Sequence, residues 1–168
     1  MEDAPVALAA AASGRQSAGM TPRFSIPEMH AYMAEIFPEL GARFEVLAMA
    51  PFALTARMAV TQADLRPGGT VSGPAIFALA DCAFYMAVLA MIGRQPLAVT
   101  TNCAIDFMRK PGLGALTGEA RLLKLGRTLA VGDVTVFSDG VEGPVARAGL
   151  TYAVPPAPGV ASQKRTRS

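Results

Sequence analysis

The 168-residue chain is poor in the residue types that most often carry enzyme chemistry. It contains one histidine, two cysteines and no tryptophan. Because His30 is the only histidine and lies on an amphipathic segment, we expect a surface or rim residue, and neither a histidine-dependent triad nor a metal cluster. Cys82 and Cys103 occupy apolar segments without CxxC or Cys/His spacing. Free thiols in a reducing compartment, the cytoplasm, are therefore expected, and neither a disulfide framework nor a zinc site.

Charge is also scarce, at 17% of residues against about 25% in a typical soluble domain. A surface so poor in charge favours burial against another copy of the chain. We therefore expect a homo-oligomer, a dimer or a dimer of dimers. The net charge is only +2, and basic residues cluster only at Lys164, Arg165 and Arg167, so no nucleic-acid groove is expected.

The length of the chain fits one domain with its own core. We place this domain at residues 25–155 and expect flexible tails at 1–24 and 156–168. Glu2 and Asp3 stand where a secretory signal carries positive charge, so no such signal is expected.

One apolar run, Pro74–Ile92, approaches the ~20 residues that cross a bilayer. Asp81 lies near its middle, and neither a Lys/Arg-rich flank nor an aromatic belt accompanies it. The run is apolar on nearly every side, so we expect a helix buried nearly all round and no membrane partner.

The pattern of apolar and turn residues predicts an α+β domain. Ser25 and Glu28 form a capping-box pattern that opens a helix ending before Pro38. Short connections late in the chain favour an antiparallel meander, and a single apolar helix beside a single sheet suggests that the sheet curls around it. The expected order of elements begins with two strands, 43–50 and 52–60, that form a hairpin. A loop and the 74–92 helix follow, and then four strands at 97–109, 115–125, 128–137 and 145–154.

At helical spacing, Phe77, Asp81 and Tyr85 share one face of the long helix, and no basic neighbour in sequence can pair with the carboxylate. Two interpretations of Asp81 stay open. It is either a structural residue, hydrogen-bonded to backbone amides or to a distant strand residue, or a partly desolvated base or nucleophile.

The start of the same helix offers a second element. Backbone N–H groups at a helix N-terminus can bind an oxyanion, and Gly73 can supply such a donor whereas Pro74 cannot. The alternative is that Gly73 and Pro74 only start the helix, which Ser72 caps.

The segment SGPAIFALADCAFYMA resembles the hallmark of hotdog-fold acyl-CoA thioesterases of the phenylacetate-degradation type, a pattern like HGGxxFxLADxAFxxA. Downstream, the stretch FMRKP is similar to the end of the first strand after the helix in this family. The stretch LGR is similar to the turn before the third strand after the helix. The resemblance covers roughly residues 40–155. The matching positions in the helix are Gly73, Phe77, Leu79, Ala80, Asp81, Ala83, Phe84 and Ala87.

This resemblance implies a hotdog fold, in which a curved antiparallel β-sheet wraps around a long central helix, assembled as dimers or tetramers. It also implies hydrolysis of an acyl-CoA thioester without metal or other cofactor, coenzyme A being part of the substrate. Asp81 would be the nucleophile or general base, and the Gly73 N–H would polarise the thioester carbonyl. Ser72 replaces the family's histidine and Pro74 its second glycine, changes that we expect to alter rate or substrate.

Gly73 and Asp81 are eight residues apart, which is about 12 Å along a helix and too far to serve one thioester carbon. One active site must then combine Gly73 of one protomer with Asp81 of another. An antiparallel pair of helices across a two-fold axis would form two such sites per dimer.

The remaining candidates are substrate contacts. Tyr85 stands where the family often has a small hydroxyl residue, so its bulk would reshape the acyl pocket. Asn102 is either a polar pocket residue or an ordinary strand asparagine. The three basic candidates lie at strand ends or turns and could meet the CoA phosphates or only keep the surface soluble. The expected substrate-binding set is Ser72, Pro74, Phe77, Tyr85, Asn102, Arg109, Lys110 and Arg127.

We therefore expect an acyl-CoA thioesterase in which Asp81 activates water or attacks the thioester directly. Two other classes stay open. A hotdog protein without the usual histidine could bind acyl-CoA as a sensor or carrier. A hydratase or dehydratase ranks below this, because such enzymes resemble a His plus Asp/Glu pairing that the chain lacks.

Overall fold

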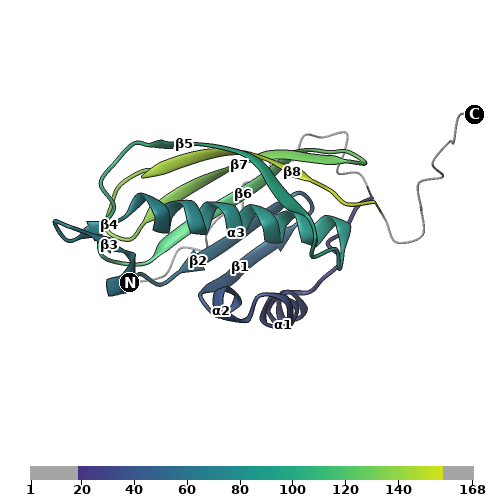
Figure 1. The fold of residues 1–168 in the computed structure, drawn as a ribbon, viewed down its shortest axis with the longest axis horizontal. Helices are drawn as coiled ribbons and strands as arrows, with labels where there is room; N and C mark the ends of the chain where they lie inside the picture. The colour runs from purple at the N-terminus through teal and green to yellow at the C-terminus, as the bar shows by residue number, and fades with distance from the viewer. Residues whose placement is uncertain (1–18, 157–168) are drawn as a thin grey trace, which may run out of the picture.

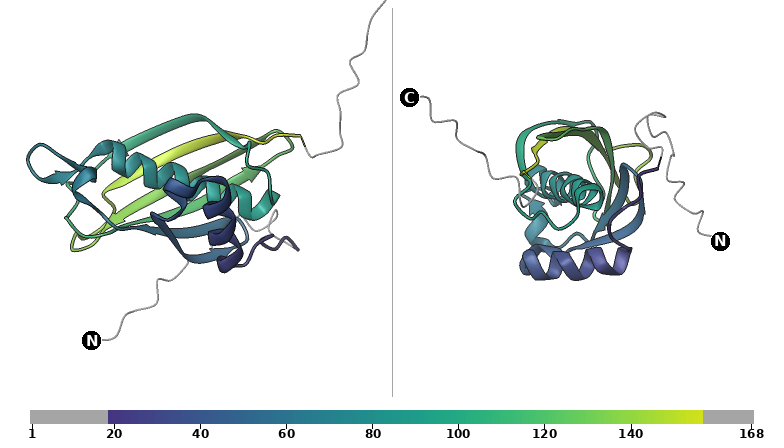
Figure 2. Two further views of the ribbon diagram at one scale, coloured as in Figure 1. Left: turned by 60° about the horizontal axis from the view of Figure 1, so that its bottom comes forward. Right: turned by 90° about the vertical axis from the view of Figure 1, so that its right-hand side faces the viewer.

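A six-stranded antiparallel sheet curves around one long helix, α3 (Gly73–Ile92), in this computed structural model, which describes residues 19–156 (Figure 1). The view along α3 in Figure 2 shows the strands bending around the helix. The strand order is β1-β2-β6-β7-β8-β5. The strands are β1 (Phe44–Ala50), β2 (Ala53–Met58), β5 (Val99–Phe107), β6 (Leu116–Leu125), β7 (Leu129–Ser138) and β8 (Ala146–Ala153). The predicted α+β class and the sheet wrapped around a central helix are confirmed.

The helix α3 begins and ends as the sequence predicts. The Ser72 side chain accepts a hydrogen bond from the Ala75 N–H at 3.3 Å, and Gly93, at φ +86°, ends the helix. It is long and apolar enough to cross a membrane, but 72% of its 18-residue apolar window is buried inside the fold. Thus α3 is the core helix of the domain.

The short helices α1 (Ile26–Ile36) and α2 (Pro38–Gly41) cover one edge of the sheet, beside β1 (Figure 2). The predicted capping box is present, α1 ends before Pro38 as predicted, and Phe37 separates it from α2, which begins at Pro38. The Nε2 atom of His30 accepts the N–H of Val46 on the edge strand at 2.8 Å. His30 thus ties α1 to β1.

Two residues just before the predicted domain start at residue 25 also contact the fold. Phe24 is buried and stacks on Tyr32, with ring centroids 5.4 Å apart. Arg23 donates its backbone N–H to the Ala90 carbonyl at 2.7 Å. Residues 1–18 and 157–168, which make up most of the two predicted tails, lie outside the described residues.

The prediction of a four-strand meander is wrong at its first strand. Strands β6, β7 and β8 follow one another in the sheet, but β5 pairs with β8 at the far edge. Strand β6 has no free edge for β5, because β2 and β7 occupy both sides of it. Consequently β5 is an edge strand, and its exposed residues include Val99 and Phe107.

The predicted loop before α3 also contains structure, namely a 3-10 turn (Gln62–Asp64) and a small hairpin of β3 (Leu65–Arg66) and β4 (Thr70–Val71). Gly68 and Gly69, at φ +94° and +68°, make its turn. The Ser72 N–H donates to the Asp64 carbonyl at 2.8 Å. This bond fixes the chain at the start of α3.

Candidate active site

One face of α3 is not covered by the sheet. The helix is buried on the sides that face the sheet, as expected. On the open face, Phe77 is 39% exposed and Asp81 and Tyr85 are only half-buried. Pro74, at the start of the helix, is exposed. This open face therefore contains the residues that the sequence singles out.

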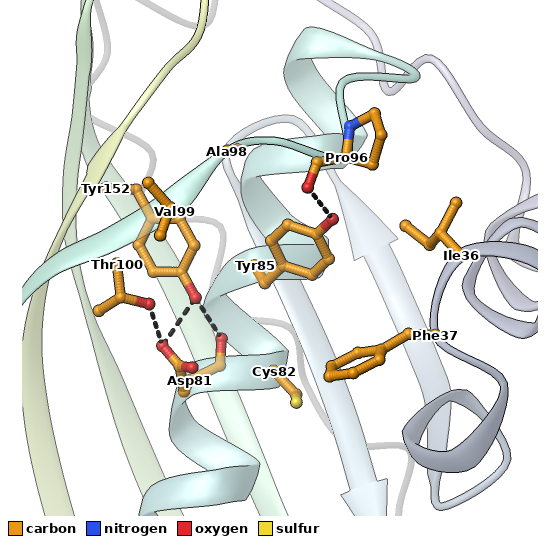
Figure 3. Close-up of a pocket in the computed structure, with 10 residues that line it drawn as sticks. All are labelled: Ile36, Phe37, Asp81, Cys82, Tyr85, Pro96, Ala98, Val99, Thr100 and Tyr152. Atoms are coloured by element: carbon orange, nitrogen blue, oxygen red, sulfur yellow. Dashed lines mark hydrogen bonds between the residues drawn. The ribbon is translucent and has the colours of Figure 1, made fainter.

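Asp81 is held by two hydroxyl groups (Figure 3). Thr100 Oγ1 and the Tyr152 hydroxyl each donate to Asp81 Oδ1 at 2.7 Å, and the Tyr152 oxygen also lies 3.1 Å from the Asp81 carbonyl oxygen. Within residues 19–156 the carboxylate has no ion pair. Distant strand residues thus hydrogen-bond to the Asp81 carboxylate, as one of the two interpretations holds, but only at its Oδ1 atom.

Neighbouring strands position these hydroxyls. Thr100 on β5 and Tyr152 on β8 are directly paired in the sheet. Tyr152 is 2% exposed, and its ring centroid lies 5.3 Å from that of Phe84 in the core. Burial and the adjacent Asp81 carboxylate hold the pKa of Tyr152 far above its usual range, so the hydroxyl stays a donor.

Asp81 opens into a cavity of about 320 Å³ between α3, the start of β5 and the corner between α1 and α2. Asp81 is the only charged residue in its lining. Figure 3 shows Phe37 and Ile36 facing Asp81 across the opening. The lining residues are Ile36, Phe37, Asp81, Cys82, Tyr85, Pro96, Ala98, Val99, Thr100 and Tyr152.

The other ionisable groups of this cavity are neutral. Burial, assisted by the charge of Asp81, raises the pKa of the Cys82 thiol to about 12, so it is not a thiolate nucleophile. Burial raises the pKa of Tyr85 to about 12 as well. The Tyr85 hydroxyl donates to the Pro96 carbonyl at 3.0 Å instead of facing Asp81. Asp81 is therefore the only anionic group available for chemistry here.

Gly73 lies in a separate cavity of about 460 Å³ at the other end of the open face. A Cβ atom at this position would meet the Phe107 ring at 3.2 Å. Its N–H belongs to the first turn, where backbone donors have no acceptor within the helix. Since Pro74 has no N–H and the Ala75 N–H is bonded to Ser72, the Gly73 N–H is the donor that the first three residues of α3 leave open toward this cavity.

The Gly73 cavity is basic, in contrast to the Asp81 cavity. Arg66, Arg109 and Lys110 line it, together with the apolar Phe107 and Met108. The Arg109 guanidinium is fixed by a 2.7 Å bond to the Pro144 carbonyl. The FMRKP stretch at the end of β5 thus borders the start of α3.

Gly73 and Asp81 do not meet within one protomer, because eight residues of unbroken helix, about 12 Å, separate them. Of the predicted substrate residues, Tyr85, Arg109 and Lys110 line a cavity, whereas Ser72, Pro74, Phe77, Asn102 and Arg127 line neither. A register irregularity between Thr100 and Asn102 interrupts β5, and Asn102 is exposed. Arg127 lies in the β6–β7 turn, at the opposite end of the sheet from Arg109.

The sequence interpretation missed Tyr152, Thr100, Phe37 and Arg66. The two hydroxyls reach Asp81 through strand pairing, which no local pattern reveals. Among residues 19–156 no group of three or more His, Cys, Asp or Glu side chains could hold a metal ion. His30 lines a different cavity from Asp81.

Comparison with known proteins agrees with this geometry. The sequence model of the thioesterase superfamily matches residues 68–144. A crystal structure of a Silicibacter protein named as a thioesterase is 55% identical, covers 82% of this chain and 96% of its own, and has a TM-score of 0.76. A variant of the phenylacetic acid degradation protein PaaI from Thermus thermophilus is 31% identical over 69% of this chain and 97% of its own, with a TM-score of 0.60.

Zebrafish thioesterase superfamily member 2 is 23% identical over 79% of this chain and 99% of its own, with a TM-score of 0.69, and shows the shared hotdog fold. No match was found among the curated proteins. The family match and the similarity to the Silicibacter protein and PaaI support a thioesterase enzyme. The chain belongs to the thioesterase superfamily.

Proposed function

We propose that the protein is a cytoplasmic acyl-CoA thioesterase that hydrolyses a CoA thioester to a free acid and CoA. The observation that carries the proposal is the Asp81 carboxylate, held at one oxygen by Thr100 and Tyr152 and open at the other to an apolar cavity. A carboxylate in such a setting suits a general base or a nucleophile.

Each active site is shared between two protomers. Phe77, Val99 and Phe107 are 39%, 57% and 55% exposed along α3 and the unpaired edge of β5, a surface that a second copy of the chain would cover. An antiparallel pairing of two α3 helices brings Gly73 of one protomer to Asp81 of the other, twice per dimer. Such dimers can pair further as a dimer of dimers.

The two ends of the open face have different tasks in this proposal. The Gly73 N–H, at the positive end of the helix dipole, stabilises the oxyanion that develops on the thioester carbonyl oxygen. Asp81 either takes a proton from the attacking water or attacks the carbonyl carbon, forming a mixed anhydride that water then cleaves. In both cases the carbon–sulfur bond breaks and CoA leaves as its thiolate.

Substrate contacts follow from the two cavities. The apolar cavity beside Asp81 takes the acyl group, with Phe37 and Tyr85 limiting its size. Arg66, Arg109 and Lys110 beside Gly73 contact the CoA phosphates. Because the two ends come from different protomers, one CoA thioester spans both.

The test is thiol release by wild type and Asp81→Ala from aryl, short-chain and long-chain acyl-CoA thioesters. We expect Asp81→Ala to lower kcat by about 10²- to 10⁴-fold, the usual contribution of a positioned base. Asp106→Ala removes an exposed carboxylate of β5 and serves as the matched control. Activity that survives in Asp81→Ala would contradict the mechanism.

One observation favours a second candidate, an acyl-CoA binding protein without catalysis. Pro74 and the Ser72 cap leave Gly73 as the one open N–H donor among the first three residues of α3, a sparse oxyanion site. This candidate predicts saturable binding of acyl-CoA without thiol release from any thioester. A hydratase is less favoured, because His30 is bonded to β1 and lies outside the Asp81 cavity.

A further inference from the structure

We propose that Tyr152 and Thr100 are positioning residues that occupy Oδ1 of Asp81 and thereby select Oδ2 as the reacting oxygen. This inference rests on the proposed thioesterase function and adds to it the atom that reacts. It assigns the hydroxyls of the β5–β8 strand pair a part in catalysis that acts through Asp81.

The hydrogen-bond geometry separates the two carboxylate oxygens. A carboxylate oxygen has about two lone-pair sites, and Oδ1 accepts two hydroxyl protons, one from Thr100 and one from Tyr152, each at 2.7 Å. No residue among 19–156 donates to Oδ2. Only Oδ2 therefore has lone pairs free to accept a water proton or to attack carbon.

Both donors are permanent. Thr100 does not ionise, and Tyr152 stays protonated because burial and the charge of Asp81 raise its pKa. The pairing of β5 with β8 fixes the two residues opposite each other, and the Tyr152 ring packs in the core against Phe84. The carboxylate thus has one orientation throughout the working pH range.

The two hydroxyls are the hydrogen-bond donors to the Asp81 carboxylate among residues 19–156. The other polar side chains near it on α3 and β5 are Cys82, Tyr85 and Cys103, and burial raises the pKa of each, so all three are neutral. The α1–α2 corner contributes only apolar residues to the cavity. The orientation of the carboxylate therefore depends on the two hydroxyls.

Tyr85 supplies a matched control. It lies one turn after Asp81 on the same helix and lines the same cavity, but its hydroxyl donates to the Pro96 carbonyl. Removing that hydroxyl changes the cavity without changing the bonds at Oδ1. The Tyr152 hydroxyl bonds to Asp81 and the Tyr85 hydroxyl does not, so an effect seen in Tyr152→Phe but not in Tyr85→Phe acts through Asp81.

The experiment compares kcat and KM for wild type, Tyr152→Phe, Thr100→Val and Tyr85→Phe. Losing either donor frees a lone pair of Oδ1 and lets the carboxylate turn, so kcat should fall about tenfold in each of the first two variants while KM stays nearly unchanged. Any effect of Tyr85→Phe should instead appear in KM, because this residue lines the cavity without bonding to Asp81. An unchanged kcat in both Tyr152→Phe and Thr100→Val would overturn the proposal. Thr100→Val is isosteric and half-buried, and it decides the question should Tyr152→Phe fail to fold.

A second measurement does not depend on activity. The ¹³C chemical shift of the Asp81 carboxyl, assigned with Asp81→Asn, is compared among the same variants at one pH. A chemical shift that changes in Tyr152→Phe and Thr100→Val but not in Tyr85→Phe supports the proposal even if no thioester is cleaved, in which case the proposed function alone has failed. An unchanged chemical shift in an active enzyme overturns this inference and leaves the thioesterase function standing.

Discussion

The two ends of the open face of α3 differ in almost every physical respect. Asp81 lies beside an apolar cavity and is held by side chains of two paired strands. Gly73 lies beside a basic cavity and offers only a backbone N–H. The first end suits an uncharged acyl group and the second an anionic one, so neither end forms a complete site for an acyl-CoA molecule.

After the loss of Asp81 itself, the largest expected effect comes from removing the Gly73 donor. Gly73→Pro deletes the N–H, and a proline is tolerated in the first helical turn. We expect kcat to fall by about 10²- to 10³-fold, as for other single oxyanion donors. Gly73→Ala adds the same Cβ beside Phe107 but keeps the N–H, so it is the control. Equal losses in both variants would show that crowding, and not the donor, is responsible.

The basic cavity predicts a change in KM. Arg109→Ala combined with Lys110→Ala should raise KM for acyl-CoA about tenfold with little change in kcat, because phosphate contacts bind substrate and transition state alike. The wild-type KM should also rise with salt. Lys124→Ala, at an exposed position of β6, is the control. A decrease in kcat without a change in KM would show that Arg109 and Lys110 do not bind CoA.

The apolar cavity predicts a smaller change in selectivity. Phe37→Ala should open the cavity and raise kcat/KM for long acyl chains relative to short ones by several-fold, about what a few buried methylenes contribute. Phe37 is 42% exposed, so the fold should tolerate the change. Leu47→Ala, an exposed apolar residue of β1, should leave the chain-length profile unchanged. An unaltered profile in Phe37→Ala would remove the α1–α2 corner from the acyl site.

The smallest effect concerns the start of α3. Ser72→Ala removes the cap on the Ala75 N–H and should lower the free energy of unfolding by about 1 kcal/mol. Because the substitution frees the Ala75 N–H near Gly73, thioesterase activity should not decrease although the free energy of unfolding does. Denaturant unfolding and thiol release, measured on the same samples, check both statements. A parallel loss of activity would indicate that Ser72 contacts the substrate.

Local patterns in the sequence were sufficient to predict most of the fold. Capping residues and apolar periodicity predicted α1, α3 and the main strands, and the motif around Asp81 indicated the carboxylate that we propose as the reacting group. The position of β5 was missed because it depends on which strand edges are already paired. Thr100 and Tyr152 were missed for the same reason, since they lie 19 and 71 residues from Asp81 in sequence and reach it only through β5–β8 pairing.

The central claim is that one site uses Gly73 of one protomer and Asp81 of another. Its most direct test mixes Gly73→Pro with Asp81→Ala, each inactive alone, under conditions that exchange protomers. A mixed dimer contains one intact site, so random mixing should restore about a quarter of wild-type activity. No recovery, in samples where mixed dimers are seen by mass spectrometry, would contradict the shared site and require each protomer to act alone.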